Sequence, residues 1–235
     1  MSDDEFDKAL VRAAFALAGR NGWEAVSVAE AARSAGLDLP RARARFPGRA
    51  AILLKLGRMA DQAVLAQVPT EGSVRDRLFY LVMERLDVLQ DHRAGVLALL
   101  RRLPFEPGTA LLLDTATRRS LRWLLEAAGV STTGLRGELR VQGLYAVWLW
   151  AVRAWQSDET DDLSPTMSAV DTALQRTGRL AEWLGDRTLD GAPEAATTTP
   201  EPPPDAAEPP APESPPPPIL GGPAPDGPIS DTPPL

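Results

Sequence analysis

"GLDLPRARARFPGR", residues 36–49, is the stretch that decides the fold. Just before it, Ser27 and Glu30 have the S-x-x-E spacing of a capping box, which marks the start of a helix. Gly36 is the residue type that most easily takes the left-handed conformation in which helices end. A second short helix is then predicted from about Leu39 to Phe46. Two short helices joined by a glycine-containing turn predict a helix-turn-helix.

The second helix of such a unit lies in the major groove of DNA, and basic groups around it hold the phosphates. This stretch carries four arginines within residues 41–49. Ala42 and Phe46 are four residues apart on one face and are predicted to be core, which leaves the arginines outside. Arg49 opens the next helix, where its side chain and the helix N-terminal amides could both meet a phosphate. The residues that we expect to contact DNA are Ser27, Leu39, Pro40, Arg41, Arg43, Ala44, Arg45 and Arg49.

Apolar residues recur at three- and four-residue spacing almost everywhere before the C-terminal tail, and no run alternates convincingly with period two. This pattern predicts an all-α fold. Beyond the helix-turn-helix, helices are expected at about 6–17, 49–68, 72–90, 92–102, 108–128, 135–156 and 164–185. We expect three parts: a helix-turn-helix domain at 1–68, a helical ligand-binding and dimerisation domain at 69–187, and a tail at 188–235.

The tail distorts both composition and charge. Residues 193–235 contain 17 of the 23 prolines and almost nothing apolar, which predicts an extended, disordered, Pro-rich segment. From Asp190 onward there are eight carboxylates and no Lys or Arg. The whole chain has a formal net charge of −7, so residues 1–189 have a net charge of +1. Residues 20–58 carry eight Lys and Arg against three acids. The acidic total therefore does not argue against a polyanionic partner.

The predicted C-terminal domain has two helices that need covering. Residues 144–152 are apolar on nearly all sides, and the last helix repeats apolar or small residues in a four-three pattern suited to packing along another helix. A subunit interface on one side and an internal pocket on the other would cover the apolar surface of both helices. The candidates for an apolar ligand pocket are Trp123, Tyr145 and Trp148. The candidates for a homodimer interface are Trp150, Met167, Val170, Leu174, Thr177 and Ala181.

The sequence lacks the residues that several classes of function require. The chain has no cysteine and a single histidine, His92, so a nucleophilic triad has no support, and we expect no enzyme. The acidic residues at 158–162 lack the spacing of a calcium loop, and we expect no metal and no cofactor. The N-terminus lacks the apolar region of a secretory signal, and the longest apolar run, nine residues, is too short to span a bilayer. We therefore expect a cytoplasmic protein.

Residues 9–56, "ALVRAAFALAGRNGWEAVSVAEAARSAGLDLPRARARFPGRAAILLKL", resemble the TetR family of transcriptional regulators. The shared order is an apolar helix, Gly22, the pair at 27–28, Ala32, the pair at 35–36, Phe46 and the apolar pair at 52–53. The all-helical remainder to about residue 186 also looks like that family's ligand-binding domain. The resemblance implies a ligand-responsive regulator that binds double-stranded DNA at a palindromic operator as a homodimer. Arg43 stands where the family usually has a tyrosine that holds the DNA backbone, and Arg49 stands where it usually has a lysine.

A second group shares the fold. The stretch at 34–54, the stretch at 75–102 and the closing helices at 143–174 also resemble the TetR-fold accessory proteins of ubiquinone biosynthesis. That resemblance implies an isoprenoid lipid as ligand and no DNA binding. The sequence leaves two functions open, with the regulator preferred: a DNA-binding regulator that responds to a small apolar molecule, or a lipid-binding accessory protein.

Overall fold

The computed structural model describes residues 1–183, so the predicted tail lies outside the described residues. The described residues form nine α-helices and two short 3₁₀ turns, without a strand, which confirms the predicted all-α fold. The helices are α1 Asp3–Asn21, α2 Val28–Ser34, α3 Leu39–Arg45, α4 Arg49–Leu65, α5 Val74–Gln90, α6 Arg93–Arg102, α7 Pro107–Ala127, α8 Gly134–Ser157 and α9 Ser164–Trp183. The 3₁₀ turns are η1 Trp23–Ala25 and η2 Leu103–Phe105.

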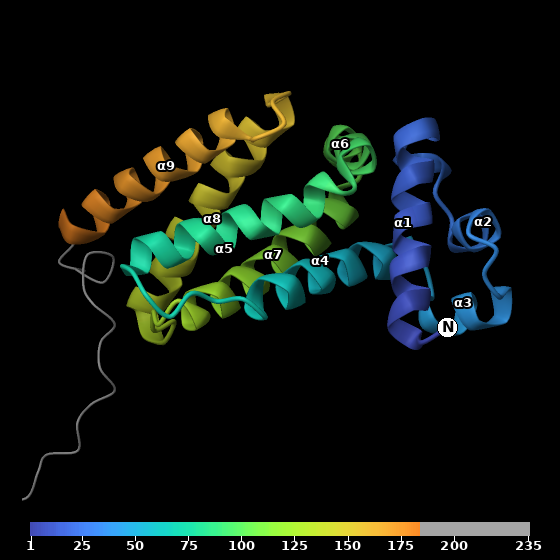
Figure 1. The fold of residues 1–235 in the computed structure, drawn as a ribbon, viewed down its shortest axis with the longest axis horizontal. Helices are drawn as coiled ribbons and strands as arrows, with labels where there is room; N and C mark the ends of the chain where they lie inside the picture. Colours follow the sequence, from blue (N-terminus) through green and yellow to red (C-terminus); the bar gives the residue numbers. More distant parts are fainter. Residues whose placement is uncertain (184–235) are drawn as a thin grey trace, which may run out of the picture. The chain divides into compact units, whose positions relative to one another are not determined.

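The first three helices group together, and α4 leads from that group to the remaining helices (Figure 1). α4 packs against α1 at one end and against α5 and α7 over the rest of its length. α9 packs mainly on α8 and, more lightly, on α5. α4 is therefore the element through which the helix-turn-helix and the later helices are joined along the chain.

One continuous apolar core runs from α1 to α9. Phe6, Phe15 and Trp23 fill its N-terminal end, and Trp155 is fully buried near the end of α8. The core passes between the two parts of the chain at the crossing of α1 and α6. Gly95 of α6 lies so close to α1 that a Cβ built on it would stand 2.2 Å from the Phe15 carbonyl oxygen. A side chain at residue 95 would therefore push the two helices apart.

A buried polar network lies within the later helices. Arg85 of α5 forms an ion pair with Asp61 of α4 and donates a hydrogen bond to Ser120 of α7. The same guanidinium lies 5.2 Å from the ring centre of Trp148 on α8. Because buried charges need partners, this network fixes α4 relative to three other helices. Among the helices of the described residues, none combines the length and the apolar character needed to cross a bilayer.

Candidate nucleic-acid interface

The turn between α2 and α3 has the geometry that the sequence predicts. Ser27 caps α2, and its hydroxyl accepts a hydrogen bond from the Glu30 amide at 3.1 Å. The Glu30 carboxylate does not return the bond of a full capping box, because it pairs with Arg33 at 2.7 Å. Gly36 follows with φ +64°, and the amides of Gly36 and Leu37 bond back to carbonyl groups of α2 in a Schellman arrangement. The glycine thus closes one helix and sets the direction of the next.

α3 is a short helix that is capped at its start and anchored at its end. The Asp38 carboxylate accepts a hydrogen bond from the Arg41 amide at 2.8 Å, and Pro40 lies in the first turn, where its missing amide costs nothing. Ala42 and Phe46 are buried, as their spacing predicts. With this face in the core, the opposite side of α3 is directed outward.

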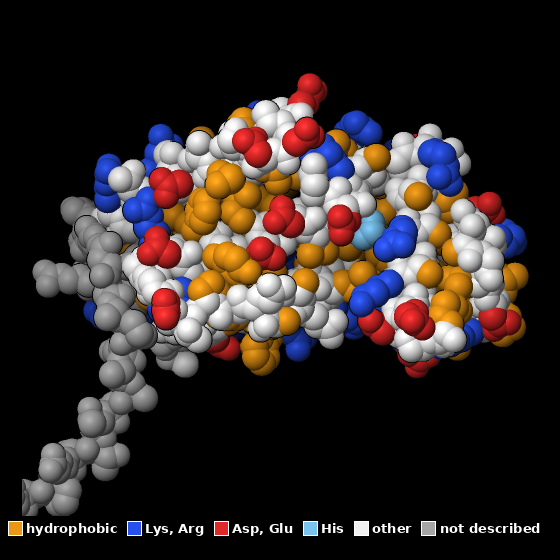
Figure 2. Space-filling view, viewed as in Figure 1, with side chains coloured by type: hydrophobic (Ala, Val, Ile, Leu, Met, Phe, Trp, Pro, Cys, Tyr) orange, Lys and Arg blue, Asp and Glu red, His pale blue; other side chains and the backbone are white. Residues whose placement is uncertain are grey.

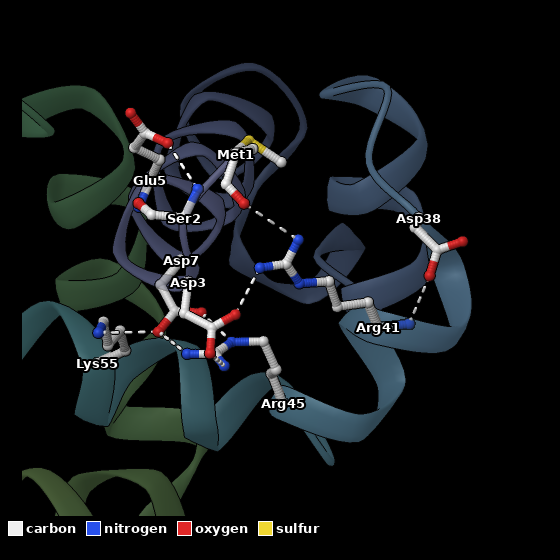
Figure 3. Close-up of polar contacts among 9 residues, drawn as sticks. All are labelled: Met1, Ser2, Asp3, Glu5, Asp7, Asp38, Arg41, Arg45 and Lys55. Carbon is white, nitrogen blue, oxygen red and sulfur yellow. Dashed lines mark hydrogen bonds and ion pairs between the residues drawn. The ribbon is translucent and has the colours of Figure 1, made fainter.

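Two of the α3 arginines are held by carboxylates from the start of α1 (Figure 3). Arg41 donates to Asp3 at 2.5 Å and lies over the Phe6 ring. Arg45 makes a two-pronged contact with Asp7, at 2.6 and 2.8 Å, and a further ion pair with Asp3 at 2.7 Å. Lys55 of α4 completes the cluster, with its ammonium 2.8 Å from Asp7. Asp7 therefore joins α1, α3 and α4 through charge.

The protonation equilibria follow these contacts. The hydrogen bond from Arg45, strengthened by Lys55, holds the pKa of the Asp7 carboxyl below its usual range. The hydrogen bond from Arg41 does the same for the pKa of Asp3. The hydrogen bond to Asp7 in turn raises the pKa of Arg45. Asp3, Asp7 and Arg45 are therefore charged at neutral pH, and the two carboxylates offset positive charge on α3.

Arg45 and Arg41 differ in how available they are to a nucleic acid. Asp7 is buried, and its carboxylate accepts two hydrogen bonds from the Arg45 guanidinium. Arg45 therefore links α3 to α1. The partner of Arg41 is Asp3, which is exposed, so solvent and phosphate can compete for that arginine. The two arginines, both expected to contact DNA, therefore have different surroundings in the folded chain.

The outward surface of α3 carries the other predicted contacts. Leu39, Pro40, Arg43 and Ala44 are exposed. Arg43 donates to the Pro47 carbonyl at 2.5 Å and has no carboxylate partner among the described residues. Ser27, at the start of α2, is also exposed, although its hydroxyl is used in the cap. One cation and mostly small or apolar groups therefore form the freely accessible part of α3.

Arg49 opens α4 as predicted, but it also has a partner. Its guanidinium lies 3.1 Å from both carboxylate oxygens of Glu106, at the start of α7. Burial alone raises the pKa of Glu106, but the hydrogen bond from Thr109 and the charge of Arg49 outweigh it, so the pKa lies below its usual value. Gly48, which precedes α4, offers no side-chain cap, so the amides of this first turn have no side-chain oxygen bound to them. An anion at this helix start would meet both Arg49 and amides that no side chain caps.

The acidic partners of these arginines are what the sequence reasoning missed. The excess of basic residues was counted over residues 20–58, whereas Asp3 and Asp7 lie 38 residues before Arg41 and Arg45 in the chain. No local pattern reveals such a pairing, because it depends on how α1 crosses α3. A signal was nevertheless present: three aspartates in the first seven residues, at helical spacing beside the apolar Phe6.

The three residues expected to line a ligand pocket have different exposures and different contacts. Trp123 is 58% exposed on α7, so it lies at the surface. Tyr145 donates to Asp114 at 2.6 Å and lies under the Arg118 guanidinium, between α7 and α8. Trp148 is buried beside Arg85 of α5. Only Tyr145 and Trp148 lie in the interior, and they face different neighbouring helices.

The residues expected at a subunit interface also have different surroundings. Val170 and Leu174 are buried in the chain's own core. Thr177 packs toward α8, where a Cβ built on Gly143 would stand 3.0 Å from its methyl group, and Ala181 is half-buried. Met167 is 41% exposed and Trp150 is 50% exposed. Of the six, Trp150 belongs to an exposed apolar stripe along α8, whose other large members are Leu135, Leu139 and Leu149.

Comparison with known proteins gives a structural match without a sequence match. No family model matches the sequence, and no curated protein matches it significantly. The TetR transcriptional regulator from Nitrosomonas europaea ATCC 19718 superimposes with a TM-score of 0.62 and 22% identity, over 75% of this chain and 99% of that one. A TetR-family transcriptional regulator from Streptomyces coelicolor gives a TM-score of 0.53 and 22% identity, over 79% of this chain and 87% of that one. Neither structure is described as a lipid-binding accessory protein, so the second function that the sequence left open gains no support. The chain has the fold of the TetR-family transcriptional regulators.

Proposed function

We propose that this chain is a TetR-type DNA-binding transcriptional regulator. Residues 1–68 would be its DNA-binding domain, and residues 69–187 its ligand-binding and dimerisation domain. The observation that carries the proposal is the presentation of α3. A capped helix is fixed by Ala42 and Phe46 on one side, so that its other side is free to enter a major groove.

The candidate contacts divide by their surroundings. Arg43 and Arg49 would hold phosphates, Arg49 together with the amides at the start of α4 that no side chain caps. Arg41 would read a base edge after leaving the exposed Asp3, and Leu39, Pro40 and Ala44 would contact the groove wall. Arg45 is left out of this set, because Asp7 holds it in the folded chain.

A second copy would bind through the apolar stripe of α8. Leu135 is 79% exposed, and Leu139, Leu149 and Trp150 are each about half exposed, which is unusual for large apolar groups aligned on one helix of a lone chain. A two-fold axis along this stripe would cover the same face of both copies. The resulting pair of α3 helices would bind a palindromic operator in the cytoplasm.

Response to a small apolar ligand is the third part of the proposal. Trp148 packs beside Arg85, and Arg85 holds α4 through Asp61. A molecule that inserted at Trp148 would disturb this network and so move α4, which leads directly to the helix-turn-helix. By linkage, a ligand that weakens DNA binding must itself be bound more weakly when DNA is present. Nile red fluorescence with and without duplex tests this reciprocity, and equal dye affinity in both states would refute it.

DNA binding is tested by selecting duplexes from a randomised library and then measuring anisotropy at 50 and 200 mM salt. A regulator that contacts six to ten phosphates should lose about 10³- to 10⁵-fold in affinity over this range. Arg43→Ala should weaken binding on all sequences, whereas Arg41→Ala should also relax sequence preference. Arg179→Ala, which removes the same charge near the end of α9, is the control. An unenriched library together with a flat salt response would overturn the proposal.

A further inference from the structure

A groove lies between α5 and α9, away from α3 and from the exposed stripe of α8. It consists of two hollows of about 450 and 260 Å³, which share Phe79 and Met167 as lining residues. The first also has Arg75, Asp76, Ser168 and Asp171 in its lining, and the second has Tyr80, Met83, Asp87, Gln90, Asp161, Asp162 and Leu163. In Figure 2, hydrophobic side chains gather over this part of α5 and α9, with acidic groups among and around them.

The floor of the groove is apolar and partly open to solvent. Phe79, Tyr80 and Met83 are half-buried along one face of α5, and Met167 of α9 is exposed opposite them. Two aromatic rings and two flexible thioethers form a surface that adapts to different apolar side chains. Apolar side chains clustered in this way mark an interaction surface when nothing in the chain covers them.

The rim of the groove is strongly acidic. Five carboxylates line it against a single cation, Arg75, whose guanidinium is already paired with Asp171 at 2.6 Å. Asp87 is exposed, and its carboxylate has no hydrogen bond and no ion pair with any described residue. Partial desolvation, followed by the neighbouring charges of Glu84 and Asp91, raises the pKa of Asp87 even though its side chain is exposed. A cation placed beside Asp87 would therefore relieve an unfavourable cluster of like charges.

The length and openness of the groove indicate the kind of occupant. Arg75 and Gln90 are 15 residues apart on α5, a distance of about 22 Å along a helix, or about four turns. Sites for small molecules enclose most of their ligand, and this groove is open along its length. The chain's own tail is acidic and would be repelled. A second copy bound symmetrically through the same face would place acid against acid.

We propose that the groove between α5 and α9 is a docking site for a basic amphipathic helix of a partner protein. Apolar side chains of that helix lie against Phe79, Met83 and Met167, and its Lys and Arg side chains lie beside Asp87 and Asp161. This is the helix-in-groove mode of recognition, with the charge pattern setting specificity. The proposal does not depend on DNA binding, because none of these residues belongs to the helix-turn-helix.

The test uses the full chain and a fluorescein-labelled peptide of 18 residues, in which Leu repeats at helical spacing and Lys fills the other positions. A peptide of the same composition, scrambled so that no apolar face forms, is the comparison. The amphipathic peptide should bind at least about tenfold more tightly than the scrambled one at 150 mM salt, because only its helix buries apolar surface. Equal binding of the two peptides would overturn the proposal, since only non-specific charge attraction would remain.

Variants locate the binding. Asp87→Asn with Asp161→Asn should weaken binding of the amphipathic peptide about four- to 25-fold, at about two- to fivefold for each exposed charge. Glu24→Gln with Glu71→Gln removes the same charge from two exposed positions outside the groove lining and should leave the affinity nearly unchanged. Met167→Gln should weaken binding without changing charge, and circular dichroism checks that each variant is folded. An equal loss in the control pair, or displacement of the peptide by tetraphenylphosphonium at comparable affinity, would reject the helix-docking assignment.

Discussion

Asp158, in the loop before α9, is a single side chain that holds two segments together. Its carboxylate accepts hydrogen bonds from the amide and hydroxyl of Thr160, at 3.0 and 2.6 Å, and from those of Thr166, also at 3.0 and 2.6 Å. Thr166 lies in the first turn of α9, where amides lack helical partners. Burial alone would raise the pKa of Asp158, but the four hydrogen bonds outweigh it and lower the pKa to about 2.

Because this pKa is lower in the folded state than the usual 3.8, the stabilisation from Asp158 is present above pH 4 and is lost as pH falls toward 2. Asp158→Asn should lower the free energy of unfolding by about 1–3 kcal/mol at pH 7, since an amide cannot accept all four bonds. Urea denaturation at pH 7 and pH 3 measures this, and the difference from the parent should shrink at pH 3. Asp161→Asn, in the same loop, should change stability by less than about 0.5 kcal/mol. A variant as stable as the parent at pH 7 would refute the role.

Asp3 permits a second test at the same scale, because its carboxylate and the base edge that Arg41 is proposed to read would compete for that arginine. If the chain binds DNA as proposed, Asp3→Asn should tighten binding about two- to fivefold at low salt, the usual worth of an exposed charge pair. Asp4→Asn makes the same change one residue away, where the carboxylate pairs with Lys8 instead, and should have a smaller effect. Anisotropy at two salt concentrations measures both variants. Equal tightening by the two would indicate a general charge effect and not competition at Arg41.

Among the elements, the crossing of α1 and α6 depends on a missing side chain. Gly95→Ala would place a Cβ 2.2 Å from the Phe15 carbonyl oxygen, so the backbones must separate. We expect a loss of about 1–3 kcal/mol or more in the free energy of unfolding. Gly57→Ala, within α4, meets nothing within 4 Å and should instead stabilise the chain by about 0.5–1 kcal/mol. Thermal or urea unfolding measures whether the free energy of unfolding falls for Gly95→Ala and rises for Gly57→Ala. If Gly95→Ala left the free energy of unfolding unchanged, the two helices could separate without loss of stability.

The elements were also the part of the structure that the sequence predicted best, because their signals are local. Ser27 and Gly36 mark the limits of α2 through bonds to residues within five positions, and Ala42 and Phe46 identify the buried face of α3 by spacing alone. The close approach at Gly95 carries no such signal, since its contact on α1, Phe15, lies 80 residues earlier in the chain. The same reason hid the pairing of α3 with the first turn of α1.

At the scale of the whole molecule, surfaces were harder to predict than the core. Helical spacing places Val170 and Leu174 on one face of α9, and the structure buries both, but spacing alone cannot tell whether the covering surface is the same chain or another one. Met167 illustrates the problem, because its position in the predicted seam suits a subunit interface and the structure places it beside α5. The apolar stripe of α8 could be recognised as a surface only once α5, α7 and α9 had been placed around the rest of that helix.

That stripe leads to the last prediction. If two copies pair through α8, the full chain should sediment at twice its 25.2 kDa, and Leu139→Glu with Trp150→Glu should return it to the monomer, because four buried carboxylates would then face one another across the axis. Phe105→Glu, at a residue that is 74% exposed on η2, makes the same kind of change elsewhere and should leave the dimer intact.

The monomeric variant should also lose sequence-specific DNA binding, because two half-sites about 34 Å apart can be held together only by a dimer. Sedimentation equilibrium and anisotropy on one selected duplex measure the two effects. If the variant stayed dimeric, the interface would not be formed by α8. If the variant were monomeric but kept its full affinity for the selected duplex, operator binding would not require a dimer.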